Sequence, residues 1–133
     1  MILVDTSVWI EFFNASAARP HLVLHNLLEA EEDVGLADII LTEILQGIKS
    51  EKSFRATKRY LLEFPIYSLK GISSYVEAAQ IYRLCRRRGH TIRRSIDCII
   101  AMVAIENDLA LFHNDKDFQS IASVVDDLKI YEY

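Results

Sequence analysis

The sequence lacks the features that mark secreted, membrane and zinc-binding proteins. It contains only two cysteines, Cys85 and Cys98, and no CxxC pair, so zinc and redox motifs are unsupported. No apolar run approaches the length needed to cross a bilayer. The first residues lack the basic segment and long apolar stretch of a signal peptide. We therefore expect a cytoplasmic protein, with no membrane partner, whose two thiols are buried and reduced.

Linkers, internal repeats and low-complexity stretches are also absent. A chain of 133 residues with 51% apolar and 26% charged residues is long enough to bury a core and has the composition of an ordinary globular protein. We expect a single domain over residues 1–133.

The charge is acidic overall, but the arginines are concentrated. A net charge of −4 gives no general attraction to nucleic acid. The stretch CRRRGHTIRR nevertheless places five arginines within ten residues: Arg86, Arg87, Arg88, Arg93 and Arg94. A solvated helix face explains such a run, but a local cluster of this kind also suits an anionic partner.

Strand-like apolar runs alternate with helix-like amphipathic runs along the chain. Strands are expected over residues 2–4, 34–38, 66–69, 110–113 and 128–133. Helices are expected over residues 7–13, 19–33, 39–49, 51–64, 72–89, 95–108 and 117–124. The helix over 95–108 is apolar on nearly every side and should therefore be central. This alternation predicts a mainly parallel sheet with helices on both faces.

Four carboxylates occupy positions where a buried segment would not be expected to carry charge. Asp5 follows the first strand, Asp115 follows the fourth, Glu43 lies in an apolar helix, and Asp97 opens the most apolar helix. Asp5 and Asp115 are equally explained as helix N-caps. Asp97 is explained as an acid at the positive end of its helix, after a Ser95 cap. Glu43 is harder to explain, because an acid at a buried face needs a partner.

Taken together, the four acids indicate a shared site. In a parallel sheet all four would face one end, and ligand crevices lie beyond the carboxyl ends of such strands. Grouped carboxylates repel one another, and a divalent cation relieves that repulsion. Ligands that are all oxygen suit Mg²⁺ or Mn²⁺. The pattern therefore predicts, in outline, a metal-dependent site that cleaves phosphodiester bonds.

Four segments also resemble a known family in their order and spacing. VDTSVWI, LTEILQG, SIDCIIAMVAIEND and NDKDF resemble the PIN-domain ribonucleases, and more narrowly the VapC toxins of toxin–antitoxin pairs. The resemblance covers the whole chain. It implies an α/β fold, a three-layer α/β/α sandwich with a mainly parallel central sheet. It also implies an Mg²⁺- or Mn²⁺-dependent endoribonuclease that acts as a toxin, forms a homodimer and is inhibited by a small cognate antitoxin protein.

The resemblance assigns roles to individual acids. By motif position the acids of the family fall on Asp5, Glu43, Asp97 and Asp115, with Asp117 as a candidate fifth. We expect Asp5, Asp97 and Asp115 to hold the cation, directly or through water. Glu43 is expected to bind a second ion or to orient the attacking water.

Two further residues near the acids are candidate accessory groups. Thr6 matches the small hydroxyl residue that the family carries beside its first acid. His113 stands where many relatives carry Thr or Ser, two residues before the fourth acid. We expect His113 to be a strand-end residue with a satisfied hydrogen bond, with a phosphate contact as the alternative. The five clustered arginines are candidates for contacts to the RNA backbone, and such contacts weaken with salt.

Two other functions fit the same kind of sheet. A phospho-accepting receiver domain also carries acids at strand exits, but it pairs its first acids as neighbours, whereas Asp5 is flanked by Val4 and Thr6. A non-catalytic binding module would keep the fold and serve only as a partner surface. Retention of all four acids favours the nuclease.

Overall fold

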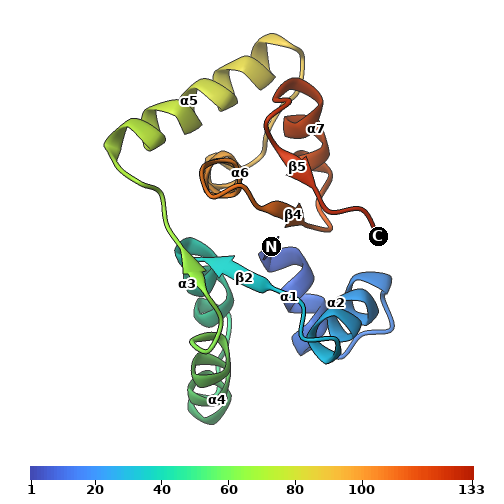
Figure 1. Cartoon of the computed structure of the whole chain (residues 1–133). Helices are drawn as coiled ribbons and strands as arrows, with labels where there is room; N and C mark the ends of the chain where they lie inside the picture. Colours follow the sequence, from blue (N-terminus) through green and yellow to red (C-terminus); the bar gives the residue numbers. More distant parts are fainter.

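Five short parallel strands form one sheet through the centre of the protein (Figure 1). The structure is a computed structural model and describes residues 1–133. The strands are β1 (Ile2–Val4), β2 (Val34–Ala37), β3 (Ile66–Tyr67), β4 (Ala110–Phe112) and β5 (Lys129–Ile130). All four strand pairs are parallel, which confirms the predicted parallel sheet. Because both faces are covered, β2 is buried along its whole length.

Seven helices cover the two faces of the sheet. They are α1 (Thr6–Phe13), α2 (Arg19–Glu29), α3 (Asp38–Gln46), α4 (Glu51–Leu61), α5 (Ile72–Arg87), α6 (Ser95–Glu106) and α7 (Lys116–Val124). Helices α5, α6 and α7 pack together on one side, while α1 packs against α2 and α3 on the other (Figure 1). The α/β/α sandwich is therefore confirmed. No helix is both long and apolar enough to span a membrane.

The strand order places a topological switch point at the carboxyl ends of the two central strands. The order is β3-β2-β1-β4-β5. The chain adds β2 and β3 on one side of β1, and then β4 and β5 on the other. Chains leaving β1 and β4 turn to opposite faces, and ligands bind at such a switch point. Val4 pairs with Phe112, and the amide N–H of Asp5 donates to the Phe112 carbonyl at 2.9 Å. This register sets the residues that follow the two strands side by side.

Helix α6 is the most buried helix, as its composition predicts. It contacts α5, α7 and β4, and six of its twelve residues are buried. Cys98 on α6 and Cys85 on α5 are both buried free thiols, which confirms that prediction. The expected Ser95 cap is wrong. Arg94 occupies the N-cap position without a side-chain cap bond, and Ser95 is the first helical residue.

The largest differences from the predicted elements lie at the edges of the sheet. Strands β3 and β5 contain two residues each, because an edge strand has only one neighbour to pair with. The tyrosines that follow β5 instead pack on Phe112, with ring centroids at 5.2 Å for Tyr131 and 4.9 Å for Tyr133. Helix α2 ends at Glu29, short of the polar run that was expected to continue it. The stop at Gly89 is confirmed, since its φ of 84° favours glycine.

Candidate functional site

The structure brings five carboxylates together at the carboxyl ends of β1 and β4. Asp5 and Asp115 are the N-caps of α1 and α7, and Asp97 lies in the first turn of α6. Asp117 lies in the first turn of α7, and Glu43 reaches the group from α3. Three helix N-termini converge here, and their positive dipole ends favour negative charge.

Asp5 is both a helix cap and a site residue. Its Oδ2 accepts hydrogen bonds from the amide of Ser7 at 3.0 Å and from the Ser7 hydroxyl at 2.6 Å. Its Oδ1 is buried and has no hydrogen-bond donor. Burial raises the pKa of Asp5 above its usual value, although the bonds from Ser7 lower it. Capping therefore uses one carboxylate oxygen and leaves the other free.

Ser7 is a site residue that the sequence analysis missed. Its hydroxyl donates to Asp5 and accepts from the amide of Asn114 at 2.9 Å, so it joins the turn after β1 to the turn after β4. The signal in the sequence was the hydroxyl residue two positions after Asp5. Its contact with the Asn114 amide was not predictable, because that contact depends on the pairing of β1 with β4.

Asp97 is fully buried and only half satisfied. Its Oδ1 accepts a hydrogen bond from Nη2 of Arg94 at 2.8 Å, whereas its Oδ2 has no donor. Burial raises the pKa of Asp97 to about 6, with smaller contributions from the charges of Asp5 and Asp115, even though Arg94 lowers it. An unpaired oxygen on a buried acid calls for a cation or a proton.

Asp115 and Asp117 face Asp97 from the start of α7. The three residues each present a carboxylate oxygen within 4.8 Å of the other two. Arg93 neutralises part of their charge, because its Nη2 lies 2.8 Å from Asp115 Oδ1 and its Nε lies 3.0 Å from Asp117 Oδ2. Asp117, the candidate fifth acid, is 3% exposed and so belongs to the interior of the group.

Glu43 is held by two donors. Its Oε1 accepts from the Thr6 hydroxyl at 2.8 Å and its Oε2 accepts from Nη1 of Arg94 at 2.7 Å. The partner that a part-buried glutamate requires is therefore Arg94, together with Thr6. Arg94 bridges Glu43 on α3 and Asp97 on α6, two residues far apart in the chain.

The negative charge and the oxygen ligand atoms of this group fit a hard divalent cation. The group contains five carboxylates and only two guanidinium groups, those of Arg93 and Arg94, so carboxylates outnumber positive charges. Asp5 Oδ1 and Asp97 Oδ2 are buried oxygens without a donor. Oxygen is the ligand atom that such cations prefer, and no histidine or cysteine of the zinc type joins the group of Asp97, Asp115 and Asp117.

His113 supports the turn that carries Asp115. It is 6% exposed, and its Nδ1 accepts a hydrogen bond from the Asp115 amide at 3.1 Å. Burial lowers the pKa of the imidazole, in keeping with the role of Nδ1 as a hydrogen-bond acceptor. The hydrogen bond expected for His113 is confirmed, although β4 ends at Phe112 and His113 is the residue that follows it.

The five clustered arginines separate into two groups. Arg93 and Arg94 contact the acids, whereas Arg86, Arg87 and Arg88 form no ion pair with them. The guanidinium of Arg86 instead lies 5.8 Å from the centroid of the Tyr82 ring.

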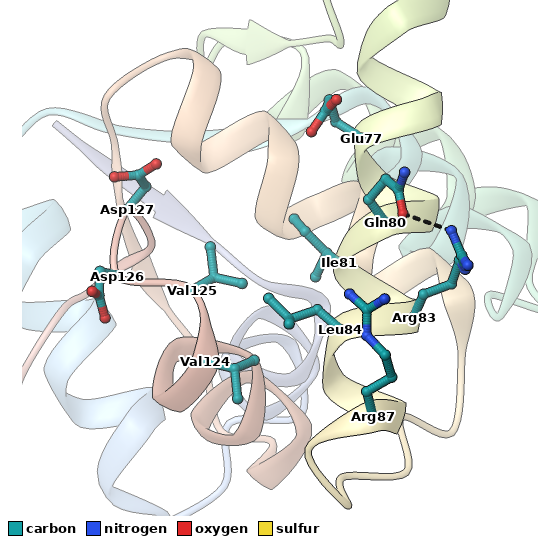
Figure 2. A pocket seen from close by; sticks show the side chains of 10 residues that line it. All are labelled: Glu77, Gln80, Ile81, Arg83, Leu84, Arg87, Val124, Val125, Asp126 and Asp127. Carbon is teal, nitrogen blue, oxygen red and sulfur yellow. Dashed lines mark hydrogen bonds between the residues drawn. The ribbon is translucent and has the colours of Figure 1, made fainter.

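The largest surface hollow is separate from the acids. This hollow has a volume of about 710 Å³ and lies between α5 and the turn before β5, and its lining side chains are drawn in Figure 2. Arg83 and Arg87 extend from α5 on one side, Asp126 and Asp127 lie on the other, and Val125 is among the apolar residues between them. None of the five site carboxylates lines it.

A second hollow adjoins Glu43. This groove of about 480 Å³ runs between α1 and the α3–α4 connection. Ile10 and Phe13 line it and are 46% and 37% exposed, and Ser53 and Thr57 line its α4 side. It is the hollow that includes one of the site acids.

Comparisons with a family model and with known sequences agree on one family. The PIN domain family matches residues 2–124. Ribonuclease VapC11 from Mycobacterium tuberculosis is 34% identical over 125 residues, which is 93% of this chain and 93% of that protein. The VapC ribonuclease Mb1587 from Mycobacterium bovis is similar to the same extent, 34% over 93% of each chain.

Solved structures share the fold at lower sequence identity. VapBC2 from Rickettsia felis, solved bound to a DNA fragment from its promoter, has a chain with a TM-score of 0.75 and 17% identity, covering 100% of this chain and 99% of that one. VapBC-1 from nontypeable Haemophilus influenzae gives a TM-score of 0.71 and 20% identity over 99% and 98% of the two chains. FitAcB from Neisseria gonorrhoeae gives 0.71 and 20% over 99% and 97%.

Proposed function

The chain belongs to the PIN-domain family, and from that premise we propose that it is the endoribonuclease toxin of a toxin–antitoxin pair. The observation that carries the proposal is the pair of buried, donor-free oxygens on Asp5 and Asp97, set among further carboxylates at the switch point of the sheet. We take residues 1–133 as one nuclease domain. The free buried thiols of Cys85 and Cys98 favour action in the cytoplasm.

We assign the cation to Asp5, Asp97 and Asp115, with Asp117 beside them. Mg²⁺ suits an all-oxygen site that shares its remaining positions with phosphate, and Mn²⁺ is the alternative. When bound, such an ion polarises a phosphate and lowers the pKa of water. The protein residues supply the geometry: Ser7 fixes Asp5, the Asp117 amide and His113 fix the turn of Asp115, and Arg94 fixes Asp97.

The substrate proposed for this site is RNA. Arg93 and Arg94 are 61% and 48% exposed beside the acids, where they are available to backbone phosphates. Arg86, Arg87 and Arg88 are exposed near the end of α5, and we retain them as candidates for more distant phosphates. Contacts of this kind make binding salt-dependent.

The partners proposed are a cognate antitoxin and a second copy of the chain. The groove beside Glu43 offers exposed Ile10 and Phe13 to a small protein that would cover the site. Ile72, Tyr75 and Val76 give α5 an exposed apolar face, with Ile72 81% exposed, that suits a homodimer contact.

Cleavage of a mixed RNA pool by the purified, antitoxin-free protein tests the proposed function. We expect the protein to cleave RNA in Mg²⁺ or Mn²⁺ and to be inactive in chelator. Cleavage should recover fully when the cation is returned, because the carboxylates hold the ion that polarises the phosphate. Gel analysis of the RNA after timed incubation measures the result. Cleavage that persists in chelator would contradict the metal-dependent site. No cleavage by a folded protein under either cation would favour a non-catalytic binding module.

A further inference from the structure

Glu43 differs from the other acids of the site because neither of its oxygens is free. Thr6 donates to Oε1 at 2.8 Å, and Arg94 donates to Oε2 at 2.7 Å. Both bonds have the length of strong hydrogen bonds, and the bond from Arg94 is charge-assisted. Each carboxylate oxygen has two lone pairs. At Glu43 a protein donor already occupies one on each oxygen, whereas Asp5 and Asp97 each have a buried oxygen with no donor.

The oxygens that remain free belong to other residues. Asp5 Oδ1 and Asp97 Oδ2 are buried without donors while Arg94 stays in place. The carboxylates whose oxygens lie within 4.8 Å of one another are Asp97, Asp115 and Asp117. Asp5 and Glu43 lie outside this group, and of these two only Asp5 has an oxygen without a donor. A cation can therefore be held on the Asp97 side of the group without displacing the bond between Arg94 and Glu43.

Arg94 has donors to spare. A guanidinium carries five N–H groups in a rigid fork, and Arg94 directs one at Glu43 and one at Asp97. The side chain is 48% exposed, whereas the side chains of Glu43 and Asp97 are 10% and 0% exposed. Arg94 thus lies at the surface of the site, anchored from beneath, with unused N–H groups available to an anion.

We propose that Glu43 is a positioning residue for Arg94, not a ligand of the cation. In this arrangement Glu43, held in turn by Thr6, keeps the guanidinium of Arg94 beside the acid cluster, where it binds the RNA phosphate that is cleaved. Arg94 is then a catalytic residue, and Glu43 acts through it. The inference rests on the RNA-cleaving cation site proposed above and replaces the role first expected for Glu43, which was to bind a second ion or orient water.

The proposal predicts a charge balance that a metal-ligand role for Glu43 does not. As an ion pair, Glu43 and Arg94 have opposite effects on a nearby cation. Glu43→Gln leaves the Arg94 charge uncompensated and should weaken Mn²⁺ binding about tenfold, whereas Arg94→Gln should strengthen it about tenfold. The double variant removes both charges, so its affinity should return to within about threefold of the wild type. If Glu43 were a ligand, Glu43→Gln would also remove a bond to the cation, and the double variant should bind Mn²⁺ more than about threefold more weakly than the wild type.

Calorimetric titration of Mn²⁺ into the wild type, both single variants and the double variant measures this cycle without any RNA. Asp97→Asn serves as the variant that loses a cation ligand. Arg59→Gln is the matched control, because Arg59 on α4 is also exposed but forms no ion pair with the acids. Melting curves establish that each variant is folded before the titration.

RNA cleavage provides the second readout. Removing the guanidinium or its anchor should slow cleavage about 10²-fold in either single variant, as for loss of one transition-state donor. The double variant should be no slower than Arg94→Gln, because both changes remove the same contact. Arg94→Lys should recover only part of the activity, since an ammonium lacks the fork that joins Glu43 to Asp97.

The outcomes are distinct. Restored Mn²⁺ affinity in the double variant, with cleavage still lost, supports the proposal. Affinity that stays weak in the double variant overturns it and makes Glu43 a cation ligand. Full cleavage by Arg94→Gln at saturating Mn²⁺ also overturns it. A wild-type protein that binds no Mn²⁺ would instead overturn the cation site itself, and this inference with it.

Discussion

An Asp97→Asn variant is expected to cleave RNA about 10³-fold more slowly than the wild type and to lose stabilisation by Mn²⁺. Asp97 is fully buried, and its Oδ2 has no hydrogen-bond donor in the protein. We therefore expect this oxygen to bind the cation directly. A cation contributes several kcal/mol of transition-state stabilisation, and about 4 kcal/mol corresponds to that loss of rate. Single-turnover cleavage and melting curves with and without Mn²⁺ measure the two effects.

Asp108→Asn is the matched control for this variant. Asp108 is an exposed acid that pairs with Lys129, away from the five site acids, so its loss should change neither cleavage nor the response to Mn²⁺. If Asp97→Asn kept most of the activity and still melted at a higher temperature in Mn²⁺, Asp97 would not be a cation ligand.

The cation-free protein is expected to lose stability as the pH rises, and the pKa of Asp97 explains why. Burial raises this pKa from 3.8 to about 6, so the folded state binds the proton more tightly than the unfolded state. Stability from this group is therefore complete below about pH 4 and is lost as the pH rises through 6, by about 3 kcal/mol in total. Burial of Asp5 also raises its pKa, which acts in the same direction.

Denaturant unfolding in chelator at pH 5 and pH 7.5 measures this dependence. The wild type should lose about 1.5 kcal/mol between the two values through Asp97 alone, and Asp97→Asn should lose much less. Mn²⁺ should reverse the dependence in the wild type, because the cation binds the ionised carboxylate. Equal pH dependence in the wild type and Asp97→Asn would show that Asp97 is not the titrating group.

The location of the site was predictable from the order of strands and helices. Parallel strands end at the same edge of a sheet, so Asp5 and Asp115 were expected to be neighbours once each was seen to follow a strand. Asp97 was predicted from its place at the start of the most apolar helix. Glu43 was predicted because its neighbours along the helix are apolar and an acid there requires a partner.

The partners of these acids were not predictable from the sequence. The run containing Arg93 and Arg94 has the composition of a solvated basic face, and nothing in it distinguishes the two arginines that turn toward the acids from Arg86, Arg87 and Arg88. Their direction is set by the path of the chain between α5 and α6. That path depends on how the two helices pack, which is a tertiary effect.

Lengths at the edges of the sheet were also poorly predicted. Apolar runs around β3 and β5 continue beyond the paired residues, since hydrophobic side chains there pack on the core without joining the sheet. Tyr131 is the clearest case, because it lies after β5 and packs against Phe112. A pattern of apolar residues therefore predicts which residues are buried better than it predicts which residues pair in a strand.

The most direct test of the proposed centre is the position of Mn²⁺ in a crystal of the wild-type protein, located by its anomalous scattering. We predict one peak bonded to Asp97 Oδ2 and Asp5 Oδ1, with Arg94 still joined to Glu43. A peak bonded to Glu43, with Arg94 displaced from it, would contradict the assignment of that residue. A crystal grown in saturating Mn²⁺ with no peak among these carboxylates would contradict the account as a whole.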